Sequence, residues 1–265
     1  MDEKLRSLVE VFFVIVIFIA FAIIVDTMAP EIYAGWLKKG FMILISILII
    51  VAKHKPREYG LIPRNIRLSL KWGTIFLFVF IIPAFVVLGL YIDKITLDYS
   101  SLLIDFLWFL IFTGFAEELM FRGYIQSRLN ECFTDTYNKF LDFNVTWHKG
   151  TLITGALIFG PIHILNAINF RTWEINLTIS VILIAVMASL FGVLFGVTRE
   201  ISGDIIICSI IHGIVDFVAI TLLSNISGYF IYWVPLAISF FIFFGFLFEK
   251  FIAEFKIDVL YSGKS

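Results

Sequence analysis

The sequence predicts an all-α membrane protein, a polytopic bundle of about eight transmembrane helices. Sixty per cent of the 265 residues are hydrophobic and only 15% are charged, whereas soluble domains average about 45–50% apolar and about 25% charged residues. Apolar runs of roughly 20 residues, the length that a helix needs to cross a bilayer, recur along the chain. A barrel strand needs only about 10 alternating residues, so the length of these runs favours helices.

Apolar runs occupy most of the chain and leave no stretch long enough for a separate soluble domain, so residues 1–265 are predicted to form a single membrane domain. The first run is expected to be a retained helix, because acidic residues precede it and no small-residue cleavage site follows it. The fourth run is expected to leave the hydrocarbon near Gln126. The expected spans are 8–28, 34–52, 72–92, 102–128, 149–169, 176–197, 203–223 and 228–252.

Lys and Arg residues are distributed unevenly between the two ends of these spans. With a cytoplasmic amino terminus, 15 of them fall on the cytoplasmic side and four, at positions 38, 39, 94 and 171, on the other, with Arg122 inside a span. The positive-inside rule therefore predicts that both termini are cytoplasmic. The basic segment 53–71 fits an amphipathic stretch on the anionic cytoplasmic leaflet, although a solvated basic loop explains it equally well.

The first group of charged residues inside a span is Glu117, Glu118 and Arg122. Burying charge in a bilayer costs at least about 2.5–3.5 kcal/mol per residue, so such residues need partners in the protein interior. Glu118 and Arg122 are four residues apart and can pair on one helix face, either to order the bundle or to support a site. Glu117 lies about 100° round the helix from Glu118. It has no local cation, so we expect its carboxylate to do chemistry.

Two further spans contain histidines. His163 lies near Pro161, which is expected to bend the helix, and Asn166 falls on about the same face as His163. His212 and Asp216 are four residues apart and share a face, either as a simple hydrogen-bonded pair or as a pair that binds one water or metal. The expected depths of Glu117, His163 and His212 place them in one layer between the cytoplasmic leaflet and the midplane.

A carboxylate and two imidazoles can activate water in two ways, and both stay open. A divalent metal such as zinc can lower the pKa of a bound water. Alternatively, Glu117 can act as a general base while the histidines stabilise an oxyanion. Both lead to hydrolysis. The net charge of −1 gives no case for nucleic acid as a partner.

Three motifs in this order, EExxxR, FxxxH and HxxxD, resemble those of the CPBP family of intramembrane proteases. They are Glu117-Glu118-x3-Arg122, Phe159-x3-His163 and His212-x3-Asp216. This family includes type-2 CAAX prenyl endopeptidases and bacteriocin-processing or Abi-like proteins. The resemblance covers about residues 100–220, which would form the catalytic core.

The resemblance implies that Glu117 activates the attacking water. His163, His212 and Asp216 would complete the catalytic set, and the same four residues would be the ligands of a metal. Glu118, Arg122, Phe159 and Asn166 would support them. Asp216 stands where the eukaryotic CAAX enzymes favour Asn, which leans toward prokaryotic relatives. Family members are usually described as metalloproteases, although a metal-free glutamate mechanism has also been argued.

The leading hypothesis is an intramembrane endopeptidase that hydrolyses a peptide bond near the cytoplasmic leaflet. Its partners would be membrane lipid and a peptide or protein substrate, including a lipid-modified one such as a prenylated CAAX tail. Two alternatives stay open. One is a non-catalytic membrane protein, such as an immunity factor or complex subunit. The other is a proton-coupled transporter that uses Glu117 and the histidines as a relay, although no internal repeat of the transporter kind is visible.

Overall fold

The computed structural model describes residues 2–90, 99–222 and 233–262, and it confirms the predicted all-α membrane protein. Among these residues, six helices are long and apolar enough to cross a membrane, and Ile206–Leu222 is a shorter apolar helix. The six are α1 (Glu3–Met28), α2 (Glu31–Ala52), α3 (Ile66–Leu90), Lys149–Ala167, α9 (Ile179–Ser202) and Trp233–Leu260.

Several of the predicted spans are built from consecutive helical stretches of different pitch. The fourth runs without interruption from Tyr99 to Asn130, so it ends four residues beyond the expected exit at Gln126. Its parts are α4 (Tyr99–Leu107), η2 (Trp108–Gly114), α5 (Phe115–Glu118), η3 (Leu119–Gln126) and α6 (Ser127–Asn130), of which η2 and η3 are π-helical. Such π-helical turns are rare and often occur at functional sites.

The fifth, seventh and eighth predicted spans have the same composite build. The fifth comprises α7 (Lys149–Leu152), η4 (Ile153–Phe159), α8 (Gly160–Ile162) and η5 (His163–Ala167). The seventh comprises α10 (Ile206–Asp216) and η6 (Phe217–Leu222). The described part of the eighth comprises α11 (Trp233–Ile242), η7 (Phe243–Leu247) and α12 (Phe248–Ser262).

Two short antiparallel hairpins connect helices and were not anticipated. β1 (Thr136–Phe140) pairs with β2 (Phe143–His148) between α6 and α7. β3 (Ile168–Asn169) pairs with β4 (Glu174–Ile175) between η5 and α9. Residues 53–65 form turns rather than a helix, and α3 begins at Ile66.

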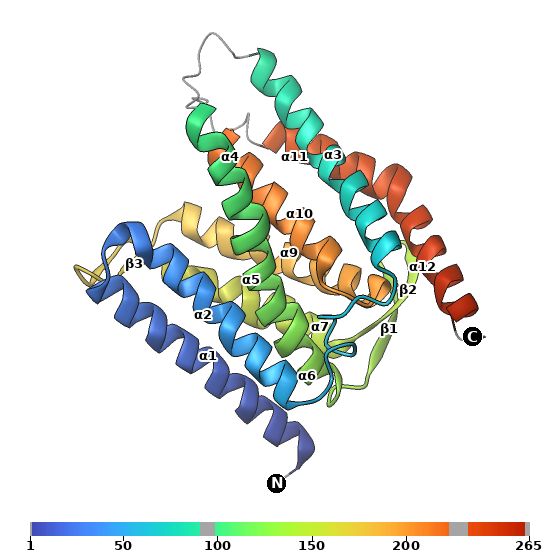
Figure 1. Cartoon of the computed structure of the whole chain (residues 1–265), viewed down its shortest axis with the longest axis horizontal. Coiled ribbons are helices and arrows are strands. Elements are labelled where there is room, and N and C mark those ends of the chain that lie inside the picture. The colour runs from blue at the N-terminus through green and yellow to red at the C-terminus, as the bar shows by residue number, and fades with distance from the viewer. Residues whose placement is uncertain (1, 91–98, 223–232, 263–265) are drawn as a thin grey trace. The chain divides into compact units, whose positions relative to one another are not determined.

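The chain divides into two compact units, and each is described by itself. The first comprises residues 1–62 and 116–203. In it, α1 and α2 lie side by side, α2 packs on η3, and α9 packs on η4 (Figure 1). A Cβ on Gly192 would come within 2.8 Å of the Gly155 Cα, so α9 and η4 meet backbone to backbone. Two carbonyls of α9, those of Gly192 and Gly196, also accept hydrogen bonds from η3.

The second unit comprises residues 63–115 and 204–265. In it, α10 packs against both α3 and η2. A Cβ on Gly213 would come within 2.6 Å of the Leu110 Cα, so the helix that carries His212 lies directly on η2. The rings of Trp72, Phe76, Phe243 and Phe251 fill the core between α3 and the carboxyl-terminal helices.

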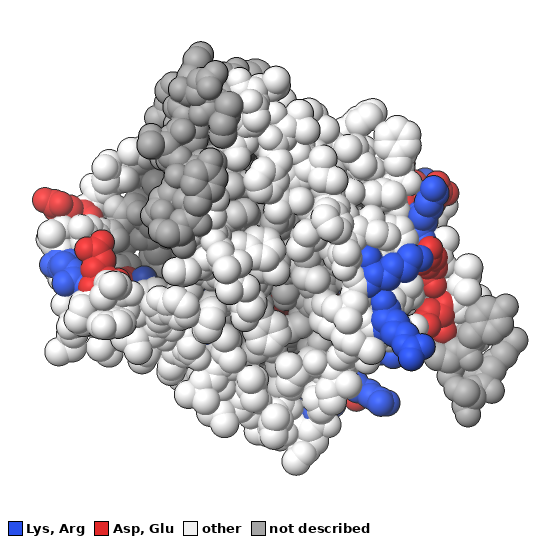
Figure 2. All heavy atoms as spheres, turned by 45° about the horizontal axis from the view of Figure 1, so that its top comes forward, with Lys and Arg blue, Asp and Glu red and all other residues white. Residues whose placement is uncertain are grey.

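The surface is suited to a lipid environment. Most of the surface in Figure 2 carries no Lys, Arg, Asp or Glu side chain. In the most apolar part of α1 only 17% of the residues are buried within the protein, and Phe12 and Phe13 are 61% and 57% exposed. Apolar side chains left exposed in such number are stable only against lipid. The chain is therefore an integral membrane protein.

Candidate functional site

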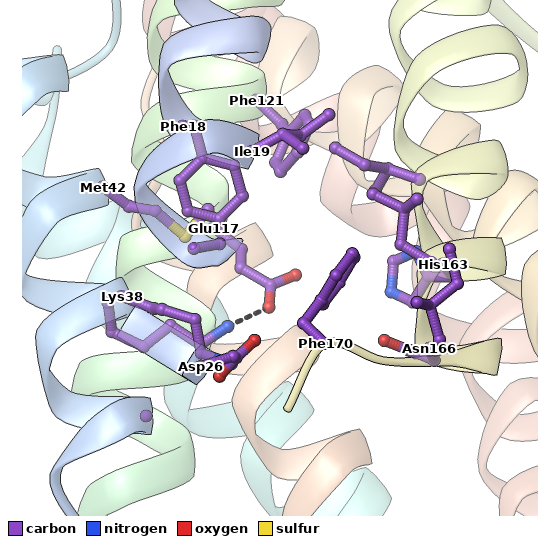
Figure 3. A pocket seen from close by; sticks show the side chains of 16 residues that line it. Phe18, Ile19, Asp26, Lys38, Met42, Glu117, Phe121, His163, Asn166 and Phe170 are labelled. Atoms are coloured by element: carbon purple, nitrogen blue, oxygen red, sulfur yellow. Dashed lines mark hydrogen bonds and ion pairs between the residues drawn. The ribbon is translucent and has the colours of Figure 1, made fainter. Parts of the chain in front are cut away.

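A pocket of about 500 Å³ lies within the first unit, between α1, α2, η3 and η5. Its walls are mostly apolar, as in ordinary small-ligand sites, but Glu117, His163 and Asn166 line it together. Figure 3 shows Glu117 and His163 on different sides of the pocket. Two of the three predicted motifs, which lie more than 40 residues apart in the sequence, therefore border the same cavity.

Lys39 of α2 donates a hydrogen bond to the Glu117 carboxylate. The expectation that Glu117 has no cation nearby was therefore wrong. The reason is that the partner comes from another helix, 78 residues away in the sequence, and spacing along one helix cannot reveal such a contact. Lys38, the residue directly before Lys39, pairs with Asp26 of α1 at 2.8 Å, and both side chains line the pocket. Two ion pairs therefore lie at one cavity.

Glu118 and Arg122 form the ion pair that their spacing predicts. Arg122 Nη1 lies 3.0 Å from Glu118 Oε1, and both side chains are completely buried. Arg122 Nη2 also donates to the Gly192 carbonyl at 3.1 Å, and Gln126 Nε2, one turn on, donates to the Gly196 carbonyl at 3.0 Å. These bonds fasten η3 to α9 and so hold the helix that presents Glu117.

Phe159 lies between the arginine of the first motif and the histidine of the second. Its ring lies 4.1 Å from the Arg122 guanidinium carbon, a cation–π contact. The same ring meets the His163 ring edge-on, with centroids 4.9 Å apart. Phe159 is 2% exposed, so it joins the buried ion pair to the pocket wall by packing.

The change of helical pitch after Pro161 orients His163. The His163 backbone N–H bonds to the Gly160 carbonyl in a tighter turn, so the Phe159 carbonyl is contacted instead by His163 Nδ1 at 2.8 Å. In a neutral ring, Nδ1 must donate in this bond, which leaves Nε2 as the acceptor nitrogen. The local break in the helix thus selects a tautomer, as second-sphere carbonyls do for reactive histidines.

His212 and Asp216 belong to the second unit, where the structure brings them together. His212 Nε2 lies 3.4 Å from Asp216 Oδ2. His212 is 6% exposed, while the Asp216 side chain is 28% exposed. The predicted local pairing within the third motif is therefore present, at a distance typical of an ion pair rather than a short hydrogen bond.

The pocket lies well away from the end of the helix that carries Glu117. Glu117 is 13 residues, about 20 Å, before the end of this helix at Asn130. Its partner Lys39 is the ninth residue of α2, a helix whose start was assigned to the non-cytoplasmic side. The depth of the site in the membrane and the cytoplasmic location of both termini stay predictions.

The pocket does not offer the set of ligands that a divalent metal needs. Among the described residues there is no group of three or more His, Cys, Asp or Glu side chains that could hold a metal ion. Moreover, Lys39 donates to the Glu117 oxygen that a cation would approach. The residues at the pocket therefore do not fit a zinc site, for which three or four ligands are usual.

Comparison with known families identifies the segment that contains all three motifs. Residues 99–218 match the model of the family described as Type II CAAX prenyl endopeptidase Rce1-like. This segment is an Rce1-like domain. The match to this family supports protease activity on a protein substrate. Neither the comparison with curated proteins nor that with solved structures gave a match.

The Rce1-like domain does not contain the whole pocket. α1 and α2 lie outside the matched residues, yet they contribute Asp26, Lys38 and Lys39 to the pocket wall. The sequence held one signal for these residues, since three charged side chains within apolar helices need partners in the protein. Their proximity to predicted span ends made them look like loop residues.

Proposed function

We propose that this protein is an intramembrane endopeptidase in which Glu117 activates the attacking water. The observation that carries the proposal is that Glu117 and His163, from two separate motifs, line one pocket inside an Rce1-like protein. Peptide hydrolysis requires a group that removes a proton from water and groups that stabilise the oxyanion as it forms. A carboxylate and an imidazole on opposite sides of a cavity meet these two requirements.

In the proposed reaction, Glu117 accepts a proton from water as the water oxygen attacks the peptide carbonyl carbon. The carbonyl π bond breaks, and its electron pair forms the oxyanion, which the Nε2–H of His163 stabilises when its ring is in the imidazolium form. When the oxyanion collapses, the C–N bond breaks and Glu117 returns its proton to the leaving amine. The products are a carboxylic acid and an amine, and Glu117 ends as a carboxylate.

Lys39 has a positioning role in this proposal. Its ammonium group contacts the Glu117 carboxylate, and both side chains are largely buried, with 19% and 14% exposed. Side-chain motion is restricted when both partners of an ion pair are enclosed, so the carboxylate is kept in place at the pocket. Small displacements of a reacting group cost large factors in rate.

His212 and Asp216 are proposed to serve the same reaction, on the strength of their place in the third motif. Asp216 would orient the His212 ring, as a carboxylate does for many reactive histidines. Glu118 and Arg122 would support the helix that carries Glu117, and Phe159 and Asn166 would support His163. The metal alternative requires at least three His, Cys, Asp or Glu side chains in one place. No such group is found among the described residues.

The substrate hypothesis that follows from the family is a CAAX-type prenylated tail. The apolar lining of the pocket, which includes Phe18, Met42 and Phe170, is compatible with a lipid-modified peptide. We derive no specificity beyond a peptide bond in a partly apolar segment.

The proposal is tested with purified protein in lipid nanodiscs. Wild type, Glu117→Ala and His212→Ala are assayed on a farnesylated CAAX peptide and on a peptide library, with circular dichroism as the check on folding. We expect wild type to cleave and both folded variants to lose cleavage. Cleavage that survives both substitutions would sink the site assignment. Loss of wild-type activity with chelator, restored by added zinc, would favour the metal alternative.

A further inference from the structure

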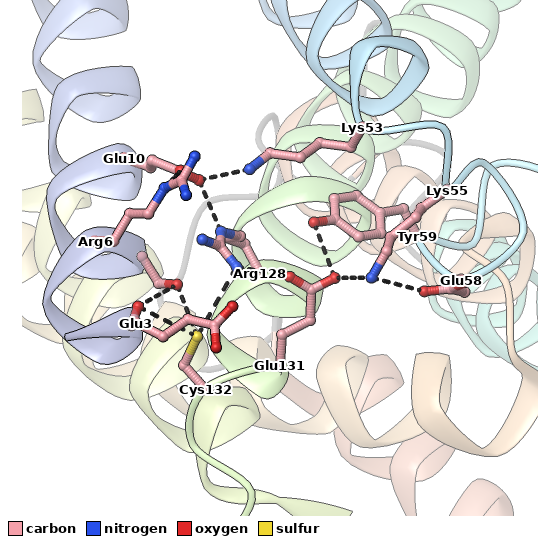
Figure 4. A network of polar contacts seen from close by, with 11 residues as sticks. Glu3, Arg6, Glu10, Lys53, Lys55, Glu58, Tyr59, Arg128, Glu131 and Cys132 are labelled. Carbon is pink, nitrogen blue, oxygen red and sulfur yellow. Dashed lines mark hydrogen bonds and ion pairs between the residues drawn. The ribbon is translucent and has the colours of Figure 1, made fainter. Parts of the chain in front are cut away.

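The first unit has two chemically different ends, and one of them is rich in Lys and Arg. At this end, Glu10 of α1 pairs with Lys53 and Arg128, both at 2.7 Å. Glu131 pairs with Arg128 at 2.8 Å and with Lys55 at 2.9 Å. Figure 4 shows these groups joined in a network. The start of α1, the end of α2 and the end of α6 therefore lie together, and we call this place the basic end.

The basic end gathers most of the positive charge of the first unit. It carries nine Lys and Arg residues. The opposite end of the described part of the unit carries three, and Arg122 is buried between the two ends. The three are Lys38, Lys39 and Arg171, of which the first two are paired with Asp26 and Glu117. The nine are Lys4, Arg6, Lys53, Lys55, Arg57, Arg128, Lys139, Lys149 and Arg199.

The pocket lies at the opposite end from this network. Along α1, Asp26 of the pocket is 16 residues, or about 24 Å, beyond Glu10. Along α2, Lys38 is 15 residues, or about 22 Å, before Lys53. The segment after η5 also reaches the pocket, through Ile168 and Phe170.

A hydrogen bond joins two connecting segments at the end of the unit where the pocket lies. Arg171 Nη2 donates to the Ala29 carbonyl at 2.7 Å, which ties the β3–β4 hairpin to the turn between α1 and α2. The hairpin and this turn therefore form the rim near the pocket. Because they are connecting segments rather than spanning helices, they belong to the membrane surface at that end.

We propose that the pocket opens toward the non-cytoplasmic side of the membrane. The positive-inside rule places short loops rich in Lys and Arg in the cytoplasm. The basic end carries nine Lys and Arg residues and the pocket end three, so the rule assigns the basic end to the cytoplasm. The pocket is separated from that end by most of the length of α1 and α2. The rule counts Lys and Arg residues rather than net charge, so Lys38 and Lys39 are included among the three although both form ion pairs.

This orientation rests on the proposed hydrolysis, but it replaces a prenylated CAAX tail at the cytoplasmic leaflet with another class of substrate. A polypeptide that reaches Glu117 must be presented from the non-cytoplasmic side, either as an exported segment or as the outer part of a membrane-anchored protein. The pocket volume of about 500 Å³ is in the range of sites for small ligands. It therefore admits a short extended stretch of such a chain rather than a folded domain.

The test uses thiol labelling in intact cells and needs no enzymatic activity. Thr172→Cys, on the exposed hairpin at the pocket end, is compared with Arg57→Cys, exposed at the basic end, both in a Cys132→Ala/Cys208→Ala background. The probe is a membrane-impermeant maleimide. We expect Thr172→Cys to react in intact cells and Arg57→Cys to react only after permeabilisation. The reverse pattern, or labelling of both without permeabilisation, would overturn the proposal.

A second arm separates the side of entry from the proposed function. A membrane-impermeant peptide that the purified protein cleaves is added outside sealed vesicles of known orientation, with Glu117→Gln as the inactive control. Cleavage of peptide supplied on the side where Thr172→Cys reacts supports the proposal. Cleavage only from the other side contradicts it. Absence of cleavage by the purified protein would instead refute the proposed function and leave the labelling result as it stands.

Discussion

The two ends of the first unit use the same ion-pair chemistry with different results. At the basic end, Glu10 accepts from three cationic side chains and Glu131 from two, and the charges satisfy one another. At the pocket end, Glu117 pairs with Lys39 beside a cavity of about 500 Å³. Between the ends, the Glu118–Arg122 pair is completely buried. Under the proposed function, the surroundings of a carboxylate, rather than its pairing, distinguish the reactive Glu117 from the structural Glu10 and Glu131.

The largest effect on stability is expected at the buried pair. Arg122→Met leaves the Glu118 charge buried without its arginine, which costs about 3–5 kcal/mol. We expect a clear fall in the apparent melting temperature in nanodiscs. The double variant Glu118→Gln/Arg122→Met is the control, and it should lose less because no isolated charge remains. A melting temperature of Arg122→Met equal to that of wild type would refute the role of the Glu118–Arg122 pair in stabilising the helix that carries Glu117.

The pocket end should respond in activity rather than in stability. Lys39→Met removes the partner that holds the Glu117 carboxylate, and we expect kcat to fall by about 10- to 100-fold. Lys39→Arg should restore part of the loss, because it keeps a cation at the same place. Steady-state kinetics on the peptide found by the library assay provide the measurement.

Lys38 is the matched control for Lys39, since it lies on the same helix, lines the same pocket and pairs with Asp26 instead. Lys38→Met should change kcat by less than Lys39→Met. Equal losses in the two variants would show that charge in the pocket, rather than contact with Glu117, is what matters.

The basic end should show the smallest effect, and this effect should depend on pH. Burial disfavours the ionised form of Glu131, but hydrogen bonds from Lys55 and Arg128 outweigh it and hold its pKa below the ordinary 4.5. The contribution of Glu131 to the free energy of unfolding is therefore present above about pH 4.5 and is lost as the pH falls through the lowered folded-state pKa.

This pH dependence is measured as the difference in melting temperature between wild type and Glu131→Gln from pH 3 to pH 7. The difference should be modest, corresponding to about 1 kcal/mol or less for a pair near the surface. It should also shrink below about pH 4.5. A difference that stays constant over the whole range would show that the Glu131 pairs contribute nothing to stability.

Contacts within one helix could be predicted from the sequence, and contacts between helices could not. The Glu118–Arg122 and His212–Asp216 pairs follow from i, i+4 spacing, and the structure contains both. The contact between Lys39 and Glu117 joins two helices, so no local pattern reveals it. Charge in an apolar helix signals that a partner exists, but only the fold identifies that partner.

The ends of the helices were the least predictable part of the fold. The fourth predicted span, 102–128, is part of a helix that runs to Asn130, where Arg128 pairs with Glu10 of α1 and with Glu131. The hairpin of Thr136–His148 was missed although β2 carries a signal for it. β1 is largely exposed and shows no alternation, but the sequence FNVTWH of β2 alternates apolar and polar residues, and its burial follows this alternation.

The most direct test of the central claim compares the two adjacent glutamates. Glu117→Gln keeps the size of the side chain but removes the base, so turnover should fall by at least about 100-fold, with a melting temperature close to that of wild type. Glu118→Gln should instead lower the melting temperature, because it leaves the Arg122 charge buried without its partner. Turnover by Glu117→Gln within a few-fold of wild type would contradict the account.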